Sequence, residues 1–92
     1  MVDEAKISAV RKYLSLEFPG LEIRDHYDAG RKAQCFETGP GGYRSKAIIS
    51  REFLEHCDTE EIPAKLKSFL LAEHLKECNM PIIVTSAGLS AE

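Results

Sequence analysis

The chain has 92 residues, a net charge of −3 at pH 7 and ordinary proportions of apolar and charged residues. This size predicts one domain, residues 1–92, built around a single hydrophobic core. The acidic balance opposes general nucleic-acid binding, and no apolar run approaches the roughly 18 residues that cross a bilayer. The acidic N-terminus lacks a secretory signal, and three cysteines are an odd number for a disulfide framework. We therefore expect a soluble cytoplasmic protein with reduced thiols and no membrane association.

The first expected element is a helix from about Asp3 to Phe18. Apolar residues recur there at steps of three and four, as on one face of a helix: Ile7, Val10, Leu14 and Phe18. Asp3 is suited to cap the N-terminus, where its charge also favours the helix dipole. Pro19 and Gly20 then end the helix and redirect the chain.

Three consecutive strands are expected at residues 21–27, 32–38 and 43–49. The connections at 28–31 and 39–42 are short and rich in residues that favour turns. Strands joined by such short turns are antiparallel, so this stretch predicts a three-stranded meander.

The turn lengths place Tyr27 opposite Lys32 and Thr38 opposite Tyr43. Side chains alternate between the two sides of a strand, so the composition of each sheet face follows from this register. The apolar face, which is expected to meet the helices, holds Leu21, Ile23, Phe36, Tyr43, Ala47 and Ile49. The opposite face, called the outer face below, is mostly polar and holds Glu22, Arg24, His26, Ala33, Cys35, Glu37, Arg44, Lys46 and Ile48.

The outer face offers the candidate site of this sequence. In the predicted register Arg24, Cys35 and Lys46 form one cross-strand row, and His26 lies diagonally from the thiol. A thiol between two cations has a lowered pKa and a raised reactivity. The candidate binding residues are Arg24, His26, Cys35, Arg44 and Lys46. The alternative is an ordinary surface ladder of paired charges.

The elements after the sheet are helical. Ser50 is suited to cap a short helix at 51–57. Asp58 or Thr59 then begins a longer helix that runs to about Glu77, with a broad apolar face to cover the sheet.

Pro81 opens a fourth strand at 82–86, and residues 86–92 are expected to be a loose tail. The helical connection is long enough for a parallel crossover, which places the fourth strand beside the first or the third strand. The predicted fold is therefore α+β, a two-layer sandwich with the order α-β-β-β-(short α)-α-β.

Asp25, His26, Tyr27 and Asp28 include residue types that perform acid–base chemistry. Neighbours on a strand point to opposite faces, however, so these four cannot converge on one substrate. Asp25 and Tyr27 point toward the core face, with Gln34 opposite Asp25. Buried polar groups at that place need hydrogen-bond partners, which the first helix is positioned to supply. We expect a structural role for this cluster.

Two His–Cys pairs raise the question of a zinc site. His56 and Cys57 are adjacent, and His74 and Cys78 are four residues apart on one helix. Adjacent side chains diverge, and the sequence has no Cys-x-x-Cys spacing of the kind that structural zinc sites use. We therefore expect no metal and no other cofactor.

The order α-β-β-β-α together with Gly42 and Ser45-Lys46 is similar to that of double-stranded RNA-binding domains. The resemblance covers the larger part of the chain and implies RNA binding. In that family the glycine and lysine cluster opens the final helix, whereas Lys46 here leads into a predicted strand. The acidic C-terminal half also opposes phosphate binding.

Three functions are compatible with these observations. The leading hypothesis is a non-enzymatic binding or assembly module that offers the outer face or a sheet edge to a protein partner or a second copy. A small enzyme or a redox-sensitive protein that uses Cys35 is the first alternative. A weak RNA-binding domain is the second.

Overall fold

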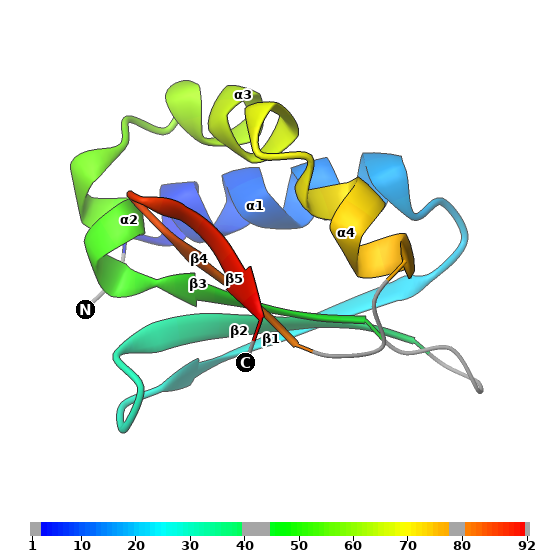
Figure 1. Cartoon of the computed structure of the whole chain (residues 1–92), viewed down its shortest axis with the longest axis horizontal. Helices are drawn as coiled ribbons and strands as arrows, with labels where there is room; N and C mark the ends of the chain where they lie inside the picture. Colours follow the sequence, from blue (N-terminus) through cyan, green and yellow to red (C-terminus); the bar gives the residue numbers. More distant parts are fainter. Residues whose placement is uncertain (1–2, 40–44, 78–80, 92) are drawn as a thin grey trace.

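The computed structural model describes residues 3–39, 45–77 and 81–91. These residues form a two-layer α+β fold in which the helices lie on one side of a five-stranded mixed sheet (Figure 1). The elements are α1 (Glu4–Glu17), β1 (Glu22–Asp28), β2 (Ala33–Gly39), β3 (Ser45–Ser50), α2 (Arg51–His56), α3 (Glu61–Ser68), α4 (Leu71–Glu77), β4 (Ile82–Thr85) and β5 (Gly88–Ala91). The predicted fold class is confirmed.

Helix α1 begins and ends where its sequence predicts. The Asp3 side chain accepts a hydrogen bond from the backbone N–H of Ala5 at 2.9 Å, which caps the N-terminus. Phe18 ends the helix, and Gly20 takes a φ of +83°, a conformation that suits glycine. The apolar stripe, together with Tyr13, is buried against the sheet.

The meander of β1, β2 and β3 is antiparallel as predicted, but both pairings are shifted by two residues. Tyr27 lies opposite Gln34, not Lys32, and Phe36 lies opposite Ala47. The reason in the first turn is Asp28, which ends β1 and accepts hydrogen bonds from the N–H groups of Gly30 and Arg31. The turn therefore uses residues 29–32.

A shift of two residues leaves every side chain on its predicted face. Phe36, Ala47 and Ile49 are almost completely buried in the core, and Leu21 and Ile23 pack against it. The core face of the meander is thus confirmed within the described residues. Tyr43 was assigned to the same face and lies outside them.

Ser50 caps α2 as predicted, because its hydroxyl accepts a hydrogen bond from Phe53 N–H at 3.0 Å. The prediction of one long helix to Glu77 is wrong. Leu70 has a φ of +59°, which ends α3 and turns the chain before α4 begins. The break leaves Leu70 half exposed while it buries Leu71, the first residue of α4.

Strand β4 lies parallel to β3, which settles the alternative that the sequence left open. The expectation of a loose tail is wrong, because residues 88–91 form β5, antiparallel to β4. Thr85 accepts a hydrogen bond from Ala87 N–H at 3.2 Å within the tight turn. Gly88 follows with a φ of +124°, which glycine adopts without strain.

Candidate functional site

The predicted row Arg24–Cys35–Lys46 does not exist in the structure. The two-residue shift places Glu37 between Arg24 and Lys46, and Cys35 between His26 and Ile48. The outer face therefore carries an alternating ladder of charges next to an apolar row. Arg44, the fifth candidate, lies outside the described residues, and a binding role for this set stays a prediction.

Cys35 is fully buried although all the described helices lie on the opposite side of the sheet (Figure 1). It belongs to a small apolar cluster with Ala33 and Ile48, and Ile83 of β4 packs against this cluster. Burial raises the pKa of the Cys35 thiol, and the charge of Lys46 offsets this effect only in part. The sequence had indicated a lowered pKa for this thiol, and the structure gives a raised pKa. The geometry therefore favours a structural role for the Cys35 thiol.

Stability is expected to fall in alkaline solution. Burial raises the pKa of Tyr13, Cys35 and Cys57. An unfolded thiol loses its proton near pH 9.0, whereas these folded thiols retain it to higher pH. Above pH 9.0 the unfolded state therefore binds fewer protons than the folded state. The contribution of these groups to the free energy of unfolding is complete below pH 9.0 and is lost as the pH rises through the pKa of the folded state.

Urea unfolding followed by circular dichroism, from neutral pH to about pH 10, measures this effect. We expect a flat free energy of unfolding up to pH 9.0 and a decline above it. The variant Cys35→Ala, which removes one of the three groups, should decline less steeply. An unfolding free energy that rises above pH 9.0 would contradict the assignment.

Of the residues that carry the RNA-binding resemblance, Ser45 and Lys46 lie in a strand and do not open a helix, and Gly42 lies outside the described residues. Lys46 lies within β3 and is paired in the ladder with Glu37. An opposite charge directly across the strands reduces what a lysine contributes to phosphate binding. RNA binding stays a prediction.

The two edges of the sheet differ sharply in charge. Strand β1 forms one edge and holds five acidic or basic residues among seven: Glu22, Arg24, Asp25, His26 and Asp28. Strand β5 forms the other edge, and residues 81–91 contain no charged side chain. Charged residues on an edge strand normally prevent pairing with another chain. By this criterion β1 is protected and β5 is open to a partner.

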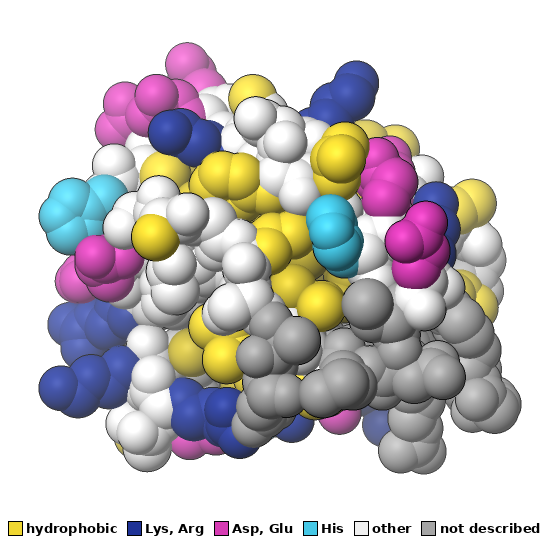
Figure 2. Space-filling view, in the orientation of Figure 1, with side chains coloured by type: hydrophobic (Ala, Val, Ile, Leu, Met, Phe, Trp, Pro, Cys, Tyr) yellow, Lys and Arg dark blue, Asp and Glu magenta, His cyan; other side chains and the backbone are white. Residues whose placement is uncertain are grey.

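Figures 1 and 2 look onto the β5 edge, with β5 drawn in front of β4. Figure 2 shows hydrophobic and uncharged groups in the middle of this face and charged side chains mainly toward its periphery. Phe69 and Leu89 are partly exposed while they pack against the core. An apolar centre with a polar rim is the common anatomy of protein interfaces.

A small pocket of ≈ 150 Å³ lies at the end of the β4–β5 hairpin. It is lined by Phe53, His56, Cys57, Glu61, Lys65, Phe69 and Ser86. Phe53 and Phe69 have ring centroids 6.1 Å apart and provide the apolar side of the pocket. The pocket therefore joins helices α2 and α3 to the hairpin.

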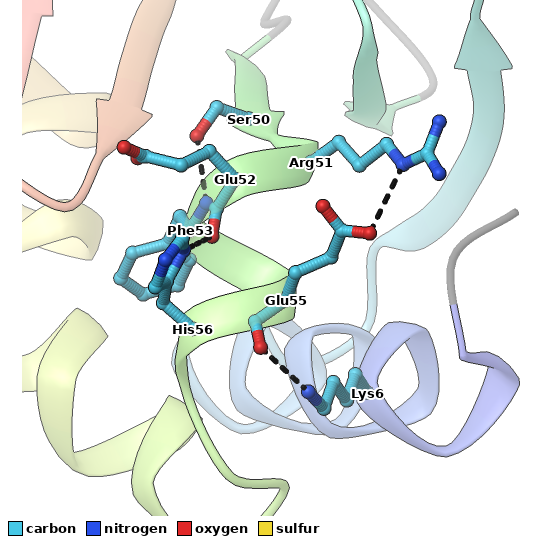
Figure 3. A network of polar contacts seen from close by, with 7 residues as sticks. All are labelled: Lys6, Ser50, Arg51, Glu52, Phe53, Glu55 and His56. Atoms are coloured by element: carbon cyan, nitrogen blue, oxygen red, sulfur yellow. Dashed lines mark hydrogen bonds and ion pairs between the residues drawn. The ribbon is translucent and has the colours of Figure 1, made fainter.

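Helix α2 is the centre of a polar network with its N-cap and α1 (Figure 3), and Glu52 adds a contact to the hairpin. Arg51 and Glu52 point to opposite sides of the helix, and Arg51 pairs with Glu55 at 3.3 Å. The Ser86 hydroxyl donates to the Glu52 carboxylate at 2.8 Å, which ties the β4–β5 turn to α2. Lys6 of α1 donates to the backbone oxygen of Glu55 at 3.4 Å. The position of β5 is thus set by helices as well as by β4.

A second pocket of ≈ 440 Å³ lies on the other side of α2. It is lined by Arg31, Lys32, Ser50, Arg51, Glu52 and Glu55. Arg31 is 3.6 Å from Asp28, and the guanidinium of Arg51 is held by Glu55. These ion pairs reduce the positive potential that an anion would require. Within residues 3–39, 45–77 and 81–91, no cluster of three His, Cys, Asp or Glu side chains is arranged to hold a metal.

Comparison with protein-family models, curated proteins and solved structures finds no match to this chain. Among the described helices, none combines the length and the apolarity that crossing a membrane requires. The fold and the site define a small α+β domain whose sheet has one charged edge and one uncharged edge. Its function is argued from that asymmetry.

Proposed function

We propose that the protein is a non-enzymatic interaction module that extends its sheet by pairing β5 with a strand of another folded protein. The observation that carries this proposal is the uncharged edge formed by β5, in contrast to the protected edge formed by β1. An unprotected edge strand presents a row of unpaired N–H and C=O groups, which is a template for strand addition.

The shortness of β5 limits the kind of partner. It has four residues, so it offers few backbone hydrogen bonds, each with a net value of about 1 kcal/mol. Ordering one residue of a flexible peptide costs about 1–2 kcal/mol, which exceeds that gain. A strand that is already part of a folded sheet avoids most of this cost. We therefore expect a partner with a preformed strand edge.

The contacts behind β5 support the same function. The bond between Ser86 and Glu52 anchors the β4–β5 turn, and Leu89 packs against the core. An edge held in this way is ordered before a partner arrives, so little conformational entropy is lost on binding.

The test uses a disulfide-cyclised β-hairpin peptide of alternating threonine and valine as a probe with preformed strand edges. Titration into the isotope-labelled protein is followed by the amide signals in NMR spectra. We expect signal changes concentrated in residues 88–91, and at least tenfold weaker binding in Ser90→Lys, because a charge blocks edge pairing.

The matched control is Ser8→Lys, which adds the same charge at an exposed position of α1. This variant should bind the probe as the wild type does. Signal changes in β1 with none in β5, or equal binding by Ser90→Lys, would overturn the proposal.

A further inference from the structure

We infer that the partner is a second copy of this chain. In this arrangement two β5 strands pair antiparallel across a twofold axis, with Ser90 opposite Ser90 of the second copy. The two sheets then join into one continuous sheet. The inference rests on the proposed function, because it names the partner for the same edge.

The faces of β5 determine the register. Leu89 is paired with Val84 and packs on the core side, whereas Ser90 is paired with Ile83 and is exposed on the outer side. Residues directly opposite in an antiparallel pair lie on the same face, and a twofold axis perpendicular to the sheet preserves the faces. Ser90 therefore meets itself, and Leu89 meets Ala91 of the second copy.

A register centred on Ala91 also preserves the faces but would pair Ser90 with residue 92, outside the described residues. The register on the other side is centred on Leu89. It requires Gly88 as a paired position, opposite Ser90 of the second copy. Gly88 has a φ of +124°, far from the extended conformation of a strand. The register centred on Ser90 uses the regular part of β5 and is the one that we assign.

Charge favours a second copy at β5 and opposes one at β1. Residues 81–91 are uncharged, so two copies meet there without like charges across the axis. A twofold pairing of β1 centred on Asp25 would place Glu22 opposite Asp28, two carboxylates on one face. Like charges directly opposite in a sheet are destabilising.

An edge of four residues is small, and standard interfaces bury about 800 Å² on each partner. The inferred dimer therefore also includes the surface beside β5, where Phe69 and Leu89 are partly exposed. The apolar groups at its centre come together in this arrangement, and the charged groups remain at the rim.

Sedimentation equilibrium over a wide concentration range tests the inference. We expect the mass to rise from that of the 10.3 kDa chain to twice that value. Ser90→Lys places two ammonium groups opposite each other and should weaken self-association at least tenfold. Ser8→Lys on α1 should leave self-association unchanged.

A cross-linking experiment tests the register. All variants carry Cys78→Ser, because Cys78 lies outside the described residues. Opposite residues have Cα atoms about 4.5–5.5 Å apart, which is compatible with a disulfide, so Ser90→Cys should form a covalent dimer on mild oxidation. Ser8→Cys, which is also exposed but lies on α1, should form no covalent dimer.

The outcomes separate the inference from the proposed function. A monomeric mass at all concentrations, with the hairpin probe still bound at β5, overturns the second copy and leaves strand addition intact. A dimer that neither Ser90→Lys weakens nor Ser90→Cys cross-links overturns the assigned edge. A monomer that also fails to bind the probe overturns both.

Discussion

Replacing Asp25 with alanine is expected to lower the free energy of unfolding by about 2–3 kcal/mol. The Asp25 carboxylate accepts hydrogen bonds from Arg11 of α1 at 2.6 Å and from the Gln34 amide at 2.7 Å. Gln34 is 4% exposed, so its side-chain amide loses a hydrogen-bond partner that water cannot easily replace. Chemical denaturation with urea measures the change.

Arg11→Ala is the comparison for this variant. The Arg11 side chain is 39% exposed, so water can solvate what remains, and its removal should cost about 1 kcal/mol or less. Asp25→Asn retains one acceptor oxygen and should lie between the two. If Asp25→Ala were as stable as the wild type, the network would not connect α1 to the sheet energetically.

Replacing Phe53 with alanine is expected to cost about 3–5 kcal/mol, the largest effect of any single change proposed here. Phe53 is 1% exposed and packs between α2 and the rest of the core, with its ring 6.1 Å from that of Phe69. Truncation removes apolar contacts and leaves a cavity beside the β4–β5 hairpin. Urea unfolding again measures the loss.

Two variants show whether burial causes this loss. Phe53→Leu keeps most of the apolar volume and should cost less than half as much. Leu16→Ala removes a large apolar side chain that is 72% exposed on α1, so it should change stability by less than about 0.5 kcal/mol. A loss at Phe53 no greater than that at Leu16 would refute the packing argument.

Local chemistry explains why much of the fold follows from the sequence. Asp3 and Ser50 cap helices because their side-chain oxygens reach nearby backbone N–H groups, an interaction within a few residues. The alternation of side chains along each strand predicted the two faces of the meander correctly, because a register shift of two residues leaves each side chain on the same face. The expectation that the first helix supplies a partner for Asp25 was confirmed by Arg11.

The failures have a different physical origin. The break at Leu70 places a leucine in the left-handed conformation, which sequence propensity assigns to glycine, so tertiary packing overrides the local preference. Strand β5 was missed although Gly88, separated from Thr85 by two residues, is compatible with a tight hairpin. A short strand that is stabilised by pairing with a neighbouring strand shows little strand preference in its own sequence.

The candidate site depended on long-range contacts that the sequence left open. Cys35 is buried partly because β4 lies beside β3 and brings Ile83 next to Ile48, which completes the outer apolar cluster. When the position of β4 is not known, the same residues predict that the Cys35 thiol is exposed and surrounded by charged side chains. The uncharged edge could not be predicted from the sequence either, because the prediction requires knowing that β5 is the last strand of the sheet.

The parallel pairing of β3 with β4 has a consequence for the order of folding. The strands β1, β2 and β3 follow one another closely in the sequence, whereas α2, α3 and α4 separate β3 from β4. Closing that long loop is slower than forming local hairpins. The complete five-stranded sheet, in which β5 is an edge anchored to β3 through β4, is therefore expected to form after the meander.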